Sequence, residues 1–175
     1  MRHRWLILIV AAVIWAWAMN TSHCQVPDGT IVFSSKKGVI GRIAKRLTGG
    51  DQYTHVGIVL SGRVYESDWP RATSTPVSRY GKRRTTNDYY VPAVSLTSQQ
   101  ISAMRHQAQA MIGTPYRLNA YFHPGRESKG MWCSPYVGHT LNAAGLGLTR
   151  HDMHEPQNVK ARLGSHWRFS HRVKR

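Results

Sequence analysis

Of the two cysteines in the chain, Cys133 is the one placed to act as a nucleophile. Ser134 and Pro135 follow it, and a proline there suits the first turn of a helix, so a helix is predicted to open at residue 132. The free amides and the dipole of a helix N-terminus stabilise a thiolate, which is the nucleophilic form of cysteine. The backbone amide of Cys133 could also donate a hydrogen bond to an oxyanion.

His55 and Glu66 are the candidates for a general base and for the group that orients it. Residues 53–60 predict the strongest strand in the chain, a two-residue Ser-Gly turn follows, and residues 63–67 predict the returning strand. This hairpin would make His55 and Glu66 near neighbours across its two strands. A histidine near a thiol favours the thiolate and can protonate a leaving group, while a carboxylate beside the histidine fixes its tautomer.

Each of these three residues also has an ordinary structural explanation. Cysteine often behaves as a small buried apolar residue, so Cys133 could be an inert member of the core. His55 could be a core histidine whose hydrogen bonds are satisfied, and Glu66 could be a solvated hairpin residue. Taken one at a time, the residues leave both interpretations open.

The segments around these residues predict the elements that would hold them in place. Strands are predicted at residues 30–33 and 88–94, and Pro92 indicates that the second strand lies at a sheet edge. Residues 68–86 are expected to form a long basic loop. The helices predicted from apolar spacing lie at residues 39–47, 97–112 and 132–144, the second opening with a Thr-Ser-Gln-Gln capping box.

Five segments of the chain occur together in a characteristic order. They are DGTIVF at 28–33, YTHVGIVL at 53–60, VYES at 64–67, IGTPY at 112–116 and WCS at 132–134. In this order they resemble the permuted papain-like amidases of the YaeF/YiiX type, which belong to the NlpC superfamily of cysteine hydrolases. The resemblance covers roughly residues 26–145.

The resemblance implies an α+β fold of the circularly permuted papain-like (NlpC) type, with an antiparallel sheet packed against the helix that bears the cysteine. It implies Cys133 as nucleophile, His55 as base and Glu66 as the residue that orients the base. In the permuted order the histidine strand precedes the cysteine helix, as it does here. Family members often carry an acidic residue where this chain has Pro135. The implied reaction is cleavage of an amide or ester bond through an acyl-enzyme, which needs no metal or organic cofactor.

The N-terminal segment has the pattern of a targeting sequence. A basic stretch at residues 1–4 precedes an uncharged apolar run, and the Ala-Trp-Ala at 16–18 fits a cleavage site. The apolar run has about 14 residues, short of the ~20 that span a bilayer. We therefore expect an exported protein, periplasmic or associated with the cell envelope. The expected organisation is a signal peptide or N-terminal anchor at 1–18, a linker at 19–27, the hydrolase domain at 28–159 and a basic C-terminal tail at 160–175.

The charge of the chain is strongly positive. Its 175 residues include 24 Lys and Arg against 8 Asp and Glu, which gives a formal net charge of +16. Such a charge could serve nucleic-acid binding or attraction to an anionic surface. Because an exported protein meets little nucleic acid, we expect a cell-wall peptide or lipid substrate and contact with an anionic membrane or polymer.

Two other functions stay open at this stage. The chain could be an inactive papain-like module that binds an anionic envelope polymer or membrane through basic segments at 71–84 and 160–175. It could also hold a metal at residues 151–155, where His151 and His154 could lie on one helical face, although no third ligand is defined by the sequence.

Overall fold

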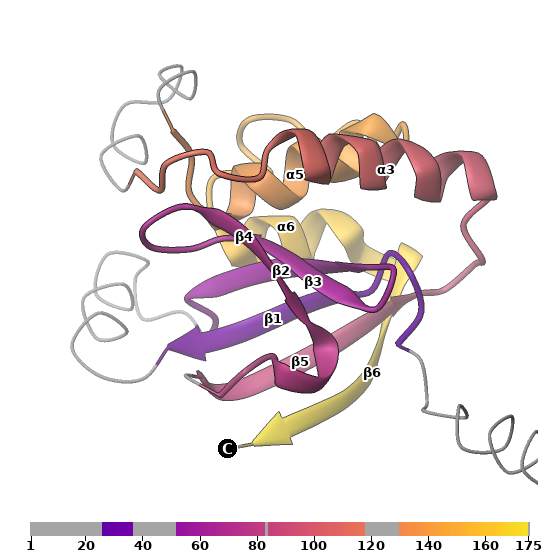
Figure 1. The fold of residues 1–175 in the computed structure, drawn as a ribbon. Coiled ribbons are helices and arrows are strands. Elements are labelled where there is room, and N and C mark those ends of the chain that lie inside the picture. The colour runs from indigo at the N-terminus through magenta and orange to yellow at the C-terminus, as the bar shows by residue number, and fades with distance from the viewer. Residues whose placement is uncertain (1–25, 37–51, 83, 118–129, 175) are drawn as a thin grey trace, which may run out of the picture.

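The fold is an antiparallel sheet of six strands with helices over one face (Figure 1). It was obtained as a computed structural model, which describes residues 26–36, 52–82, 84–117 and 130–174. The strand order across the sheet is β4-β3-β2-β1-β5-β6, and each neighbouring pair is antiparallel. The predicted targeting segment at 1–18 and the predicted helix at 39–47 lie outside the described residues.

Five strands come first along the chain, the helices follow, and a sixth strand ends the described part of the chain. The strands are β1 (Ile31–Lys36), β2 (His55–Leu60), β3 (Arg63–Ser67), β4 (Ala72–Pro76), β5 (Arg84–Pro92) and β6 (Trp167–Lys174). The helices are α3 (Ser98–Ala110), α5 (Cys133–Ala143) and α6 (Pro156–Leu163), with short 3-10 turns η1 (Val77–Arg79) and η3 (Gly164–His166). Among the helices of the described residues, none has the length and apolar character needed to cross a membrane.

The sheet separates two apolar cores, because successive side chains of a strand point to opposite faces. On the helical face, Ile58 of β2 packs with residues of α3, α5 and α6 in the larger core. Val59, its neighbour in the chain, packs on the other face in a smaller core with Val64, Tyr80 and Tyr89. The apolar alternation that predicted the strand at 53–60 therefore matches burial on both faces.

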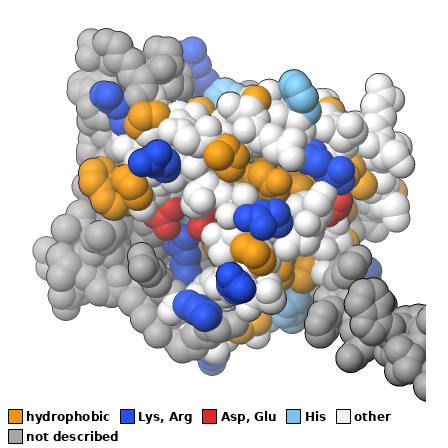
Figure 2. All heavy atoms as spheres, in the orientation of Figure 1, with side chains coloured by type: hydrophobic (Ala, Val, Ile, Leu, Met, Phe, Trp, Pro, Cys, Tyr) orange, Lys and Arg blue, Asp and Glu red, His pale blue; other side chains and the backbone are white. Residues whose placement is uncertain are grey.

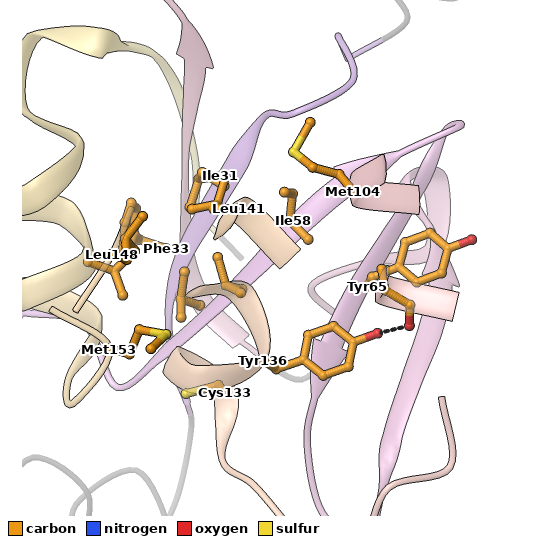
Figure 3. Close-up of a cluster of buried hydrophobic side chains, with 14 of the residues drawn as sticks. Ile31, Phe33, Ile58, Tyr65, Met104, Cys133, Tyr136, Leu141, Leu148 and Met153 are labelled. Atoms are coloured by element: carbon orange, nitrogen blue, oxygen red, sulfur yellow. Dashed lines mark hydrogen bonds between the residues drawn. The ribbon is translucent and has the colours of Figure 1, made fainter. Parts of the chain in front are cut away.

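Helix α5 occupies the centre of the larger core (Figure 3). Its residues from Cys133 to Gly138 are all buried, and the Tyr136 hydroxyl donates a hydrogen bond of 2.6 Å to the carbonyl of Ala108 in α3. A side chain at Gly138 would overlap Met153, so the close contact there requires glycine. These contacts hold α5 against α3 and against the turn that contains Met153.

The capping box predicted at the start of α3 is confirmed. Thr97 Oγ1 accepts a hydrogen bond from the Gln100 amide at 3.2 Å, and the Gln100 side chain accepts one from the Thr97 amide at 3.0 Å. The two bonds satisfy amides that a helix N-terminus leaves without a partner. Helix α5 likewise begins where it was predicted, with Pro135 in its first turn.

The interpretation of residues 160–175 as a basic C-terminal tail is wrong, because the described part of this segment is the end of α6, the turn η3 and the edge strand β6. Trp167 is buried, and its indole donates a hydrogen bond of 2.9 Å to the carbonyl of Gly29. Further along, Arg172 binds Asp88 of β5 through two hydrogen bonds of 2.6 Å. The basic residues suggested solvation, but an exposed edge strand accommodates such residues well because charge discourages pairing with other chains.

Two further expectations differ from the structure. Residues 68–86 are not one loop, because they contain β4, which pairs along β3 from Ser67 opposite Ala72 to Arg63 opposite Pro76. Strand β5 is not an edge strand, since β1 and β6 flank it. Pro92 is tolerated there because it is the last residue of β5, at the point where the ladder with β6 begins.

Candidate active site

The three residues singled out from the sequence lie together at the open end of the β2–β3 hairpin. His55 is the first residue of β2, Glu66 lies near the end of β3, and Cys133 is the first residue of α5. All three are buried, with exposed fractions of 1 %, 5 % and 4 %. Trp132 precedes the cysteine in an extended conformation, so the helix starts at the thiol itself.

The imidazole of His55 binds the carboxylate of Glu66. Its Nε2 atom lies 2.7 Å from Glu66 Oε2. Continuing the hairpin register one step beyond the Ile58–Tyr65 pair places Gly57 opposite Glu66. A Cβ atom at Gly57 would lie 2.8 Å from Val64 Cγ1 and 3.3 Å from the Tyr65 carbonyl, so the close approach of β3 at this point favours glycine.

The thiol of Cys133 faces the same imidazole. Burial and the charge of Arg84 lower the pKa of His55, but the charges of Cys133 and Glu66 and a hydrogen bond to Cys133 outweigh them, so the net pKa is raised. Because Nε2 faces Glu66, the other ring nitrogen, Nδ1, is the one left for the sulfur. The imidazole therefore binds the Glu66 carboxylate and interacts electrostatically with the Cys133 thiol.

Two residues that sequence reasoning missed also bind Glu66. The Tyr80 hydroxyl and Arg84 Nη2 each lie 2.9 Å from Oε2, the same oxygen that contacts His55. Burial raises the pKa of Glu66, but His55 and Arg84 lower it by a larger amount, so the net pKa is lowered and the side chain is a carboxylate. Burial and the Glu66 charge raise the pKa of Tyr80 well above its usual range, so the phenol keeps its proton and donates.

No local signal in the sequence distinguishes Tyr80 or Arg84. Both come from residues 68–86, where the basic composition indicated a solvated loop, and Arg84 follows other basic residues there. In the structure Arg84 begins β5 and is 4 % exposed. Its Nη2 atom also lies 3.0 Å from Asp68 Oδ2, which makes Asp68 a further member of the cluster.

The charge of Cys133 also acts on the phenol of Tyr116. Burial raises the pKa of its phenol, and the nearby charges of Cys133 and Asp68 raise it further, so the hydroxyl stays protonated. The segment that holds Tyr116 is tied to the start of α5, because the Met131 amide donates a hydrogen bond of 3.1 Å to the carbonyl of Pro115. A protonated phenol beside a nucleophile can donate a hydrogen bond to a developing negative charge.

The alternative metal site at residues 151–155 does not assemble in the structure. Among the described residues, the three-residue group with ligand atoms close enough for one ion is His55, Glu66 and Asp68, and neither His151 nor His154 belongs to it. The His154 ring lies near Glu155 at 3.8 Å, and its backbone carbonyl accepts a hydrogen bond from the Trp132 indole.

Comparison with known proteins relates this chain to others through its fold. No family model and no curated protein matches the sequence. Among solved structures, the crystal structure of the metalloprotein yiiX from Escherichia coli O157:H7 aligns with a TM-score of 0.68, covering 86 % of this chain and 99 % of that one. The chain has the fold of yiiX. The two chains share 16 % sequence identity, so the match concerns the fold alone. At the level of the fold, it supports the resemblance of the five sequence segments to proteins of the YaeF/YiiX type.

Proposed function

We propose that this protein is a cysteine hydrolase that cleaves an amide or ester bond through an acyl-enzyme. In this proposal Cys133 is the nucleophile, His55 is the general base and acid, and Glu66 orients the imidazole. The observation that carries the proposal is the buried chain of contacts in which one imidazole meets the Cys133 thiol and lies 2.7 Å from Glu66. A nucleophile, a base and a group orienting the base form the minimal apparatus for this chemistry.

The proposed reaction has two steps. The Cys133 thiolate attacks the carbonyl carbon of the substrate, forming a C–S bond and an oxyanion, and the bond to the leaving group breaks as His55 gives it a proton. Water then attacks the thioester, His55 accepts a proton from that water, and the acyl group leaves as an acid while the thiolate and imidazolium are restored. The N-terminus of α5 supports this assignment, because helix amides favour both the thiolate and the oxyanion.

Glu66 acts through His55 in this mechanism. With its lowered pKa it is a carboxylate and accepts a hydrogen bond from Nε2–H of the imidazole, which leaves Nδ1 to exchange a proton with the sulfur and the leaving group. The Tyr80 hydroxyl helps to hold the same oxygen in place. Glu66 Oε2 is therefore held by a hydrogen bond from Tyr80 as well as by its contact with His55.

The description of yiiX as a metalloprotein raises the question of whether these residues suit a metal ion. His55, Glu66 and Asp68 offer ligand atoms within 4.8 Å of one another. However, Arg84 Nη2 lies 2.9 Å and 3.0 Å from the two carboxylates, and an ion bound by both at the usual ~2.0–2.2 Å would have to take its place. The arrangement does not fit a metal, and the proposed mechanism uses none.

We further propose that the enzyme is exported and acts on cell-envelope peptides or lipids. The targeting pattern at residues 1–18 supports export. The surface supports an anionic environment, because Lys and Arg side chains recur over the face shown in Figure 2 while Asp and Glu are few there. A positive surface attracts anionic lipids and polymers.

The proposal is tested by turnover of nitroanilide peptides and nitrophenyl acyl esters with the native protein, Cys133→Ala and the control Thr140→Val. Thr140 is buried in the same helix, and its hydroxyl donates a hydrogen bond to the Tyr136 carbonyl, so it controls for disturbance of the helix. We expect turnover to disappear in Cys133→Ala and to persist in Thr140→Val, with native circular dichroism in both. Equal turnover by the native protein and the Cys133→Ala variant would contradict the proposal. Absence of turnover combined with salt-dependent retention on anionic vesicles would favour the inactive binding module instead.

A further inference from the structure

We propose that Arg84 is a positioning residue of this site, whose guanidinium serves as a built-in cation in the place that a divalent metal ion would take between Glu66 and Asp68. The expected effect on turnover rests on the proposed hydrolase function. The proposed role of Arg84 as a cation does not rest on that function, because it follows from the contacts of Arg84 alone.

The guanidinium of Arg84 contacts two carboxylates at once, as a bridging metal ion would. A bidentate pair would use two nitrogens of Arg84 on the two oxygens of one carboxylate. Here the single atom Nη2 lies 2.9 Å from Glu66 Oε2 and 3.0 Å from Asp68 Oδ2, and so joins two carboxylates. The neighbouring Nη1 atom is buried and has no hydrogen-bond partner among the residues that the structure describes, so the two carboxylates are joined through Nη2 alone.

Burial makes this positive charge necessary. The side chains of Arg84 and Glu66 are 5 % and 7 % exposed, and that of Asp68 is 25 % exposed. Two carboxylates this close repel each other, and a buried carboxylate without a compensating charge is strongly unfavourable. His55 already faces Glu66 and must change its protonation state during catalysis, whereas an arginine stays charged throughout.

The place of Arg84 in the fold keeps the guanidinium there. Its amide donates a hydrogen bond of 3.0 Å to the carbonyl of Gly81, which closes the turn before β5. Its Cζ atom lies 5.6 Å from the centre of the Tyr80 ring, and the hydroxyl of that tyrosine binds Glu66. Arg84 and Tyr80 therefore hold the same oxygen, Oε2, that contacts His55.

The test uses Arg84→Ala, Arg84→Lys and the control Arg63→Ala. Arg63 belongs to the same sheet, but its guanidinium binds Ser74 rather than a carboxylate. For metal binding, each change is made in a Cys133→Ala background so that the thiol cannot hold the ion, and Zn²⁺ is added while Tm and bound zinc are measured. We expect Zn²⁺ to raise the Tm of the Arg84→Ala protein and to bind at one ion per chain. The proteins that keep Arg84, namely the Cys133→Ala background and its Arg63→Ala variant, should bind no zinc and show no rise in Tm at the same Zn²⁺ concentration.

Several results would overturn the inference. One is a zinc ion bound by the Arg84-containing protein and lost on Asp68→Asn; another is a folded Arg84→Ala protein that binds no zinc. If Arg84→Ala does not fold alone, refolding with Zn²⁺ becomes the readout. Recovery of the fold with Zn²⁺ supports the cation role. If Zn²⁺ does not restore the fold of Arg84→Ala although Arg84→Lys folds, the cation role is rejected.

Turnover, measured with Cys133 present, tests the positioning role separately. We expect kcat to fall roughly 10- to 100-fold in Arg84→Ala with little change in KM, as when a group that orients a functional side chain is removed. Arg84→Lys, which keeps the charge, should recover part of the loss. An unchanged kcat in Arg84→Ala contradicts the positioning role. If the native protein turns nothing over, the hydrolase proposal fails while the zinc measurements still decide the role of Arg84.

Discussion

His55 Nε2 lies 2.7 Å from Glu66 Oε2, although the two residues are eleven positions apart in the chain. The hairpin that joins them turns at Ser61 and Gly62, which have φ angles of 51° and 69°. Two successive positive φ angles give the tight turn whose twist matches that of the flanking strands. The turn sets the register of β2 against β3, and the register decides which side chain meets the imidazole.

Glu66→Gln should keep the fold and lose most of the activity. The amide has the shape of the carboxylate but lacks its charge, so it no longer stabilises the imidazolium that forms during the reaction. We expect kcat to fall by about 10²- to 10⁴-fold with a smaller change in KM. Steady-state kinetics with an acyl ester measure both. A kcat within twofold of native would show that the carboxylate does not act on the imidazole.

The alkylation rate of Cys133 should depend on His55. With Cys24→Ser, so that one thiol remains, iodoacetamide should react with Cys133 at about pH 6, because an adjacent histidine and a helix N-terminus favour the thiolate. In His55→Ala the pH midpoint should move toward the ordinary cysteine value of ~8.5. The rate is followed by mass spectrometry between pH 5 and 10. Identical midpoints in the two proteins are the contrary result.

Gly57→Ala should destabilise the hairpin and displace Glu66. The added Cβ would lie 2.8 Å from Val64 Cγ1 and 3.3 Å from the Tyr65 carbonyl, which is too close without movement of β3. We expect a loss of about 1–3 kcal/mol in the free energy of unfolding, typical of overpacking, together with reduced turnover. Urea denaturation measures the first. Adding Val64→Ala removes the closest contact, so the double variant should be more stable than the sum of the single changes predicts.

Trp167→Ala should show that β6 is part of the folded domain. Trp167 is 6 % exposed and its indole binds the Gly29 carbonyl, so truncation leaves a cavity and a lost hydrogen bond. We expect a loss of about 3–5 kcal/mol in the free energy of unfolding. The control is Phe169→Ala on the same strand, which is 53 % exposed and should cost far less. Equal, small effects for both would mean that the C-terminal segment contributes little to stability.

Asp88 should contribute to stability only where it is ionised. Burial raises its pKa, but the hydrogen bonds to Arg172 and Tyr53 lower it by a larger amount, so the net pKa lies below its ordinary value of 3.8. A lowered pKa in the folded state means that the stabilisation is present above the unfolded pKa and is lost as pH falls through the folded one. In Asp88→Asn we expect a lower Tm at neutral pH and a weaker fall of Tm with acidification. Parallel Tm curves for both proteins from neutral to acid pH would contradict this.

The sequence by itself determined the parts of the site that depend on local rules. The Ser-Gly turn between two alternating strands placed His55 near Glu66, and the proline after Cys133 placed the thiol at a helix N-terminus, as the structure has them. The capping box of α3 also follows from residues three apart in the chain. Such features are readable because the interacting residues are neighbours, and the chain has few ways to arrange them.

Only the tertiary structure decided the roles of Arg84 and of the C-terminal segment. Arg84 stands among basic residues of a segment that resembles a solvated loop, and it becomes a buried cation because β3 and the residue after it bring Glu66 and Asp68 to it. Residues 167–174 have the composition of a tail and become a strand because Asp88 and Gly29, far away in the chain, offer them partners. Whether a charged residue is solvated or buried depends on what lies opposite it, and contacts between distant segments leave no local pattern in the sequence.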